Sequence, residues 1–98
     1  MASDPGLLVM VSLLGGPRHG YAISEDIEAL TGDRPGPGTL YGAIARLEQR
    51  GLIEAREGDG RRKPYALTRA GVAEVRRLLE GMETVTRAAR RRLRVQPA

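Results

Sequence analysis

Residues 35–71 constrain the fold of this chain more than any other segment, and they read PGPGTLYGAIARLEQRGLIEAREGDGRRKPYALTRAG. Leu40, Ile44 and Leu47 recur at i, i+4 and i+7, which is the spacing of one face of an α-helix. Gly51 follows them as the residue type that most often ends a helix in a left-handed conformation. Two short strand-like runs then flank a Gly-Asp-Gly turn. The segment therefore predicts a short helix followed by a β-hairpin.

The hairpin is expected to join a strand that begins at Leu52-Ile53 to a strand over residues 65–68, through the turn at residues 58–60. Pro64 should stand at a strand start or edge, because it has no N–H to donate to a ladder. Three adjacent cations lie between the turn and the second strand, so the hairpin is basic near its tip: they are Arg61, Arg62 and Lys63.

Two helices are predicted before this segment. Asp4-Pro5 has the pattern of an N-cap followed by proline at the first helical position. Residues 7–14 are apolar nearly all round, as in a helix at the centre of a small core, and residues 15–17, Gly-Gly-Pro, end it. The second helix is expected over about residues 19–30. Its predicted buried stripe is Ile23, Ile27 and Leu30.

The last helix is predicted over residues 69–93, with Thr68 as its N-cap. Its apolar residues follow an approximate 3–4 spacing, and such a helix at the end of a small domain requires a surface to pack against. It can fold back on its own domain. The three earlier helices already supply a core, however, so pairing with a second copy is favoured. The residues predicted to form that interface are Val75, Leu78, Leu79, Met82, Val85 and Ala89.

These elements together predict a fold that is mainly α with a small two-stranded β-wing, a winged helix-turn-helix. The predicted DNA-binding domain occupies residues 1–68, and a dimerisation helix with a basic tail occupies residues 69–98. The length of 98 residues corresponds to one domain. A chain this short favours a small domain with an oligomer interface over an enzyme with a deep pocket.

Side chains for catalysis are scarce. The chain has no Cys, no phosphate-cradling glycine loop and no Ser with a base at a recognisable spacing, so an enzyme and a bound cofactor are not expected. His19 is the only histidine and has no neighbours at ligand spacing, so it is expected to cap or pack rather than bind metal. Tyr21 is expected in the core. The apolar run of residues 7–14 is too short to span a bilayer, and we expect a cytoplasmic protein.

Charge divides the chain into two parts. Residues 1–60 hold five Arg against nine Asp and Glu, a net charge of −4, whereas residues 61–98 hold eleven basic against three acidic residues, a net charge of +8. Such asymmetry suggests that one face meets a polyanion, although a basic tail can simply aid solubility. Arg supplies 15 of the 16 positive charges, and its planar fork suits phosphate and guanine.

Two motifs, GPRHGYAI at residues 16–23 and PGTLYGAIARLEQRGLIE at residues 37–54, resemble the PadR-like family of bacterial transcriptional regulators. The wing sequence GRRKPYALTRAG extends the resemblance, which then covers residues 7–79. The resemblance implies a homodimeric winged-helix repressor in which the C-terminal helix pairs with its twin. It also implies that Thr39 and Tyr41 approach DNA, and that residues 61–63 form the basic wing.

The helix predicted to start near Thr39 is the candidate reader of base edges in the major groove. Gly42, Arg46 and Gln49 lie opposite its apolar face. Arg46 has the reach to bind guanine and Gln49 to bind adenine, while the alternatives are an ion pair of Arg46 with Glu48 or Glu54 and a solvated Gln49.

Thr39 and Tyr41 place hydroxyls near the start of that helix, where they are suited to phosphate. The alternatives are a simple N-cap for Thr39 and packing on the wing for Tyr41. Arg61, Arg62 and Lys63 are predicted to contact phosphate or the minor groove.

The sequence therefore predicts a cytoplasmic, homodimeric regulator of transcription that binds a palindromic operator in duplex DNA, most simply as a repressor. A small-molecule effector has no assignable site, and no membrane partner is expected. Two alternatives stay open: a winged helix that binds another protein, and a DNA-binding protein without sequence preference.

Overall fold

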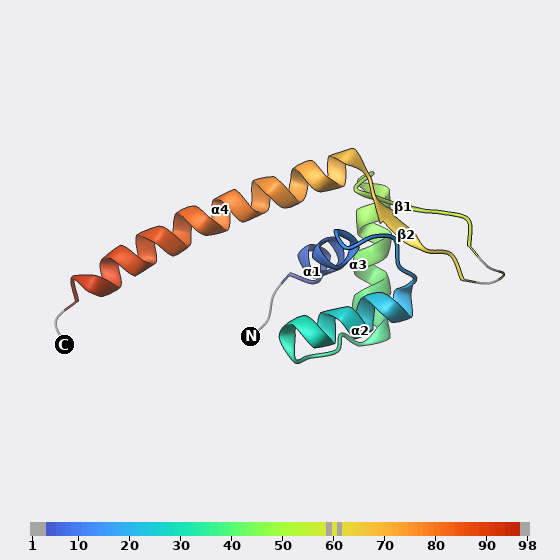
Figure 1. Cartoon of the computed structure of the whole chain (residues 1–98), viewed down its shortest axis with the longest axis horizontal. Helices are drawn as coiled ribbons and strands as arrows, with labels where there is room; N and C mark the ends of the chain where they lie inside the picture. Colours follow the sequence, from blue (N-terminus) through green and yellow to red (C-terminus); the bar gives the residue numbers. More distant parts are fainter. Residues whose placement is uncertain (1–3, 59, 61, 97–98) are drawn as a thin grey trace.

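The structure is a computed structural model that describes residues 4–58, 60 and 62–96. Its elements are α1 (Pro5–Leu13), α2 (Gly20–Thr31), α3 (Pro37–Gln49), β1 (Ile53–Ala55), β2 (Tyr65–Leu67) and α4 (Arg69–Arg94). Figure 1 shows α1, α2 and α3 gathered near the start of α4, with the hairpin projecting on one side and α4 extending away on the other. The molecule measures 60 × 27 × 20 Å. The predicted fold class, mainly α with a two-stranded wing, is confirmed.

The first helix lies at the centre of the core, as its composition predicts. α1 contacts α2, α3, α4 and β2, and Val9, Met10 and Leu13 are buried among them. The Asp4 carboxylate accepts a hydrogen bond of 3.0 Å from the Gly6 N–H, which is the expected N-cap interaction. The first two to three turns of α4, through Val75 and Leu78, complete the core around α1.

Helices α2 and α3 differ from the prediction in two details. Leu30 is 56% exposed rather than buried, because it lies in the last turn of α2 beyond Ile27, the last core residue of that helix. α3 begins at Pro37 rather than near Thr39, and Gly36 is its N-cap. Proline is compatible with the first helical position because the N–H it lacks would have no partner there.

The hairpin pairs β1 with β2 in antiparallel register, with Glu54 opposite Ala66. β1 begins at Ile53, within the predicted start. β2 ends at Leu67, one residue earlier than predicted, because Thr68 caps α4: its hydroxyl oxygen accepts from the Gly71 N–H at 3.1 Å. A further pairing was not predicted. Arg18, in the connection between α1 and α2, exchanges two backbone hydrogen bonds with Tyr65, at 3.0 and 2.8 Å. This third segment fixes the wing to the start of α2.

The first turns of α4 belong to the same body as α1–α3. Gly71 is buried, and a Cβ at that position would collide with the Leu52 carbonyl oxygen. Val75 is 2% exposed in the core. The domain boundary predicted at residue 68 stays a prediction; α4 begins at Arg69, and its first turns pack inside the body formed with α1–α3.

Candidate nucleic-acid interface

The exposed part of α3 combines small residues with the longer side chains of Arg46, Glu48 and Gln49. Leu40, Ala43, Ile44 and Leu47 bury the opposite face. Gly42 is half-buried, whereas Ala45 and Gln49 are exposed. The Arg46 guanidinium folds back toward Gly42, with Nη1 3.4 Å from the position that a Cβ on Gly42 would occupy. This face thus permits close approach of a helix to a groove, with Arg46 reaching across it.

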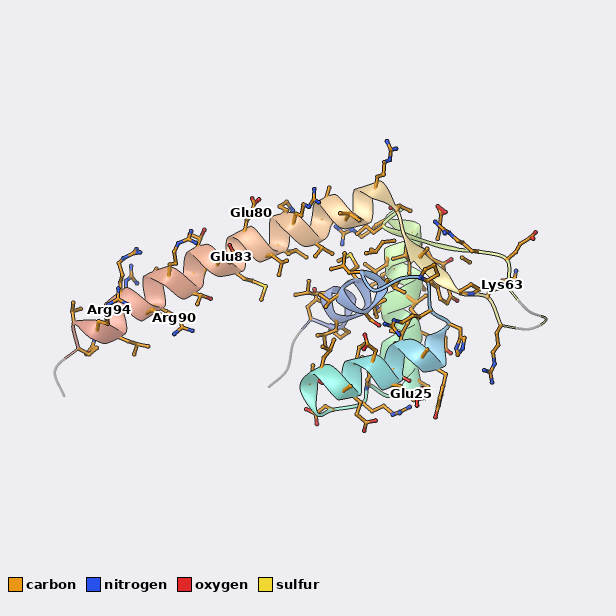
Figure 2. The ribbon with its side chains drawn as sticks, viewed as in Figure 1. Glu25, Lys63, Glu80, Glu83, Arg90 and Arg94 are labelled. Carbon is orange, nitrogen blue, oxygen red and sulfur yellow. The ribbon has the colours of Figure 1, made fainter. Side chains whose placement is uncertain are left out.

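Beside α3 lies an open hollow of about 380 Å³ between the start of α2, the start of α3 and the wing. It brings together aromatic and cationic side chains from three segments that are distant in sequence. Its lining residues are His19, Gly20, Tyr21, Tyr41, Arg62, Lys63 and Tyr65. Figure 2 shows Lys63 on the wing, at the opposite end of the molecule from Arg94.

Close packing fixes the position of Tyr41 in this hollow. The Tyr41 hydroxyl lies against Gly20, where a Cβ would collide with it. The side chain nevertheless stays 50% exposed. Tyr41 therefore packs on the start of α2, and its exposed part faces the hollow that it shares with Arg62 and Lys63. Gly20 therefore does more than begin α2, because a residue with a side chain at this position would displace Tyr41.

Tyr65 forms the inner wall of the hollow. Burial, and then the negative charge of Glu48 and the presence of Tyr41, raise the pKa of its hydroxyl above the ordinary value of 10.0. The hydroxyl therefore stays protonated at neutral pH and keeps its hydrogen for donation. Its backbone is fixed by the pairing with Arg18 described above, so the wall is rigid.

The N-terminus of α3 points outward without a side-chain cap. Gly36, the N-cap, has no side chain to accept from the N–H groups of Gly38 and Thr39. Thr39 is exposed, and its hydroxyl forms no hydrogen bond with any residue that the structure describes. The alternative in which Thr39 caps the helix is therefore wrong. The uncapped N–H groups of Gly38 and Thr39 lie at the positive end of the helix dipole, where a negative charge would be stabilised.

Arg46 lies on the other flank of α3 from Tyr41. It lines a hollow of about 260 Å³ with Asp4, Arg50, Glu74 and others at the junction of α1, α3 and α4. Within the described chain, neither Glu48 nor Glu54 lies within ion-pair distance of Arg46. The structure therefore separates the predicted contacts into two groups, Arg46 on one flank and Tyr41 with the wing on the other, with Gln49 at the far end of α3.

Glu74 holds the end of α3 against α4. Its carboxylate lies 2.8 Å from Arg77 and 3.3 Å from Arg50. Hydrogen bonding from Arg77, and then from Arg50, lowers the pKa of Glu74 from 4.5 to about 2 despite partial desolvation. Arg50 is therefore engaged inside the chain, whereas Arg46 one turn earlier is available to a ligand.

Sequence reasoning missed two members of the hollow. Tyr21, expected in the core, is 58% exposed, and the Arg34 guanidinium carbon lies 5.3 Å from the centroid of its ring. His19 takes the N-cap position of α2 without a side-chain cap and lines the hollow. The GPRHGYAI motif contains both residues and was the available signal. Arg61 lies outside the described residues.

The residues predicted for dimerisation separate along α4. Val75 packs in the core of its own body, and Leu78 is half-buried against it. Leu79, Met82 and Val85 are 39%, 51% and 68% exposed, and Ala89 is exposed too. The free apolar face therefore begins at Leu78 and continues to the end of the helix.

Two further features of the described residues bear on membrane and metal binding. No helix among the described residues is long and apolar enough to cross a membrane. In the same part of the chain, the His, Asp and Glu side chains form no group of three that would hold a metal ion.

Several known proteins are similar to this chain in sequence. An uncharacterized 37.1 kDa protein in transposon Tn4556 of Streptomyces fradiae is 50% identical over 78 residues, which are 80% of this chain and 21% of that protein. The transcriptional regulator YqjI of Escherichia coli is 32% identical over 81 residues, 81% of this chain and 39% of that protein. The chain thus spans well under half the length of these curated relatives.

A solved structure matches almost end to end. A transcriptional regulator from Clostridium thermocellum superposes with a TM-score of 0.81 at 27% identity, covering 93% of this chain and 96% of that chain. The sequence profile of the transcriptional regulator PadR-like family matches residues 7–77, which include α2, α3 and the wing completely and α1 and α4 in part. The chain therefore belongs to the PadR-like family of transcriptional regulators.

Proposed function

We propose that this chain is a cytoplasmic, homodimeric regulator that binds a palindromic operator in duplex DNA and represses transcription by blocking polymerase. The observation that carries the proposal is the continuity of the exposed face of α3 with the hollow that Tyr41 shares with Arg62 and Lys63. A groove-sized helix flanked by cations is the arrangement that DNA readers use.

Each part of this surface has a distinct task in the proposal. α3 enters the major groove, where Arg46 binds guanine and Gln49 binds adenine. The Thr39 hydroxyl and the free N–H groups at the start of α3 bind one phosphate, and Tyr41 binds the neighbouring backbone.

The wing holds the flanking DNA through its cations. Arg62 and Lys63 are exposed on the described part of the wing, and Arg61 has the same predicted task. Gly42 contributes by lacking a side chain, which lets the helix approach the groove closely.

Two copies are required for a palindrome. The apolar face of α4 from Leu78 onward supplies the contact between them, with Leu79, Met82, Val85 and Ala89 at its centre. Two α3 helices related by a two-fold axis would then enter major grooves about one helical turn, ~34 Å, apart. Two relatives, YqjI of Escherichia coli and the Clostridium thermocellum protein, are transcriptional regulators, which supports a regulatory role.

The decisive test is a gel-shift titration against the DNA upstream of the protein's own coding region, with a scrambled duplex of equal length as competitor. We expect discrimination of about 10³-fold or more. Equal binding to both duplexes would leave a DNA-binding protein without sequence preference, and no binding would leave the protein-interaction alternative. A reporter placed behind the bound sequence then tests the sign of regulation, since expression should fall when the protein is present.

Two variants separate recognition of the base sequence from binding to the DNA backbone. Arg62→Ala should weaken binding to all duplexes alike and lower the salt slope by roughly one unit. Arg46→Ala should weaken binding to the operator by about 1–3 kcal/mol and relax the preference at one base pair. If both variants behave identically, the assignment of different tasks to α3 and the wing fails.

A further inference from the structure

We infer that Arg34 positions the start of α3 for DNA binding, because its side chain fastens the connection between α2 and α3 to the side of α2. The inference rests on the DNA-binding function proposed above and adds a residue that lies outside the proposed contact surface. Arg34 acts through α3 and Tyr21 and does not bind DNA itself, so it is a positioning residue.

The connection between α2 and α3 consists of residues 32–36, with the sequence GDRPG. Gly32 ends α2 in the left-handed conformation, with φ at +87°. Among the described residues, no backbone hydrogen bond involves residue 34 or 35, and Gly36 is already the N-cap of α3. The polar interactions that fix this part of the connection therefore come from the Arg34 side chain.

The Arg34 guanidinium directs its whole fork at α2. Its Nε and Nη2 lie 3.1 and 3.0 Å from the same carboxylate oxygen of Glu28. Its Nη1 donates to the Ser24 hydroxyl at 3.3 Å, and its central carbon lies 5.3 Å from the centroid of the Tyr21 ring. These three residues of α2 are spaced at i, i+3 and i+7, so they share one face of the helix. One side chain thus holds the connection along two turns of α2.

Ser24 links this arrangement to the interior of α2. The residue is 6% exposed. Its hydroxyl donates to the Tyr21 carbonyl oxygen at 2.8 Å and accepts from Arg34. The hydrogen of the hydroxyl and one of its lone pairs are therefore both used, which defines its orientation. Arg34 consequently contacts a fixed point of α2 rather than a mobile side chain on the surface.

Both sides of the arrangement reach the proposed DNA surface. Tyr21 lines the hollow beside the wing. Arg34 precedes the N-cap of α3 by two residues, and the Leu40 N–H donates to the Gly36 carbonyl oxygen at 2.9 Å in the first turn of that helix. A connection that is ordered before binding loses little conformational freedom when DNA binds, and this increases affinity.

The ion pair of Arg34 with Glu28 contributes little to the stability of the fold. The two side chains are 37% and 48% exposed, and water screens an ion pair at such a position. Its removal should shift the temperature of thermal unfolding by less than about 5 °C. An effect on DNA binding without a matching effect on unfolding therefore distinguishes positioning from general stabilisation.

Two substitutions on α2 separate positioning from charge. Glu28→Gln and Glu25→Gln each remove one negative charge, and charge alone would strengthen binding to a polyanion in both cases. Glu28 pairs with Arg34, whereas the exposed Glu25 (Figure 2) forms no ion pair with the residues that the structure describes. In gel-shift titrations Glu28→Gln should weaken operator binding about threefold, because the connection is loosened. Glu25→Gln should leave binding unchanged or strengthen it. A Glu28→Gln variant that binds the operator as tightly as the native chain would overturn the inference.

Arg34→Ala tests the residue itself. Operator affinity should fall on the order of tenfold. The salt slope should stay within about half a unit of the native value, because no phosphate contact is removed. Arg76→Ala removes the same charge from an exposed position on α4 and should change the affinity less than about twofold. A slope lower by one unit would make Arg34 a direct phosphate contact, and an unchanged affinity would remove it from DNA binding. Either result overturns the inference.

Arg34→Lys separates geometry from charge at the same position. Lysine keeps the positive charge but lacks the planar fork, so it cannot reach Glu28, Ser24 and the Tyr21 ring together. It should therefore restore only part of the affinity lost in Arg34→Ala. Full recovery of the native affinity would mean that charge alone is sufficient, which would contradict a positioning role.

Hydrogen exchange in the free chain separates this inference from the proposed function. In Arg34→Ala the Leu40 amide should exchange several-fold faster, because the start of α3 is less ordered. The Leu8 amide, which donates to the Asp4 carbonyl oxygen at the start of α1, is the internal reference and should not change. A native chain that does not discriminate the operator would end the proposed function, while exchange would still show whether Arg34 orders α3. Unchanged exchange at Leu40 would overturn the inference even where operator binding is specific.

Discussion

The two halves of α4 share one apolar periodicity and meet different environments. In the first half, Val75 is 2% exposed and packs against the helices of its own body. In the second half, Val85 carries the same side chain on the same helix and is 68% exposed. Periodicity thus specifies which face of a helix is apolar, but the position of the rest of the chain decides what covers that face. The first half serves folding, and we propose that the second half serves association.

The largest expected effect comes from charging the second half. Met82→Asp with Val85→Asp should abolish the dimer, because a carboxylate in an apolar seam has no partner. Affinity for a palindromic operator should then fall on the order of 10²-fold, because a monomer binds only one of the two half-sites. Analytical ultracentrifugation and a gel shift measure the two consequences. A variant that still sediments as a dimer would show that association does not use this face.

Two glycines offer a sharper contrast between the halves. Gly71→Ala places a Cβ against the Leu52 carbonyl and should lower the free energy of unfolding by about 1–3 kcal/mol, or more if the backbone cannot move. Gly81→Ala meets no heavy atom within 4 Å and should raise helix stability by about 1 kcal/mol. Urea denaturation measures both changes. A Gly71→Ala variant that is not destabilised would contradict the assignment of Gly71 to the body, and a destabilised Gly81→Ala variant would contradict the open position of residue 81.

The two valines test the comparison directly. Val75→Ala should lower the free energy of unfolding by about 2 kcal/mol, because it leaves a cavity in the core. Val85→Ala removes the same atoms from an exposed position. In the monomeric Met82→Asp background it should change the unfolding free energy by less than about 0.5 kcal/mol. Equal losses from both would mean that the second half of α4 also packs on its own body.

The sequence predicted the body of the fold well, because its signals are local. The N-cap at Asp4, the stop at Gly51 and the capping role of Thr68 each depend on neighbouring residues, and the structure confirms all three. Leu30 was misassigned because a stripe read along one helix does not show where the neighbouring helices end. The start of α3 was placed two residues late, because Pro37 was assigned to the turn.

The candidate site was less accessible to sequence reasoning. The hollow joins three segments through the pairing of Arg18 with Tyr65, and no periodicity in the sequence indicates a contact over that separation. Tyr21 was assigned to the core on residue type, whereas the stacked Arg34 stabilises it at the surface. The sequence placed Arg46 and Tyr41 on one DNA-binding surface. In the structure they lie on opposite flanks of α3, and each lines a different hollow.

The smallest predicted effect concerns the ion pairs of Glu74 in the first half of α4. The pKa of Glu74 is lowered from 4.5 to about 2, chiefly by the hydrogen bond from Arg77. A carboxyl group whose pKa is lower in the folded state stabilises that state above its unfolded pKa, and the contribution is lost as the pH falls. Stability should therefore decline between about pH 5 and pH 2 in the native chain, and Glu74→Gln should make that decline shallower.

Glu80→Gln is the matched control, because it removes the same charge from the exposed second half of α4, where Glu80 forms no ion pair with the described residues. Thermal unfolding followed by circular dichroism across this pH range measures the slopes. If Glu74→Gln and Glu80→Gln flatten the profile equally, the clamp of Arg50 and Arg77 on Glu74 does not stabilise the fold, and α4 is held to the body by apolar packing around Val75 alone.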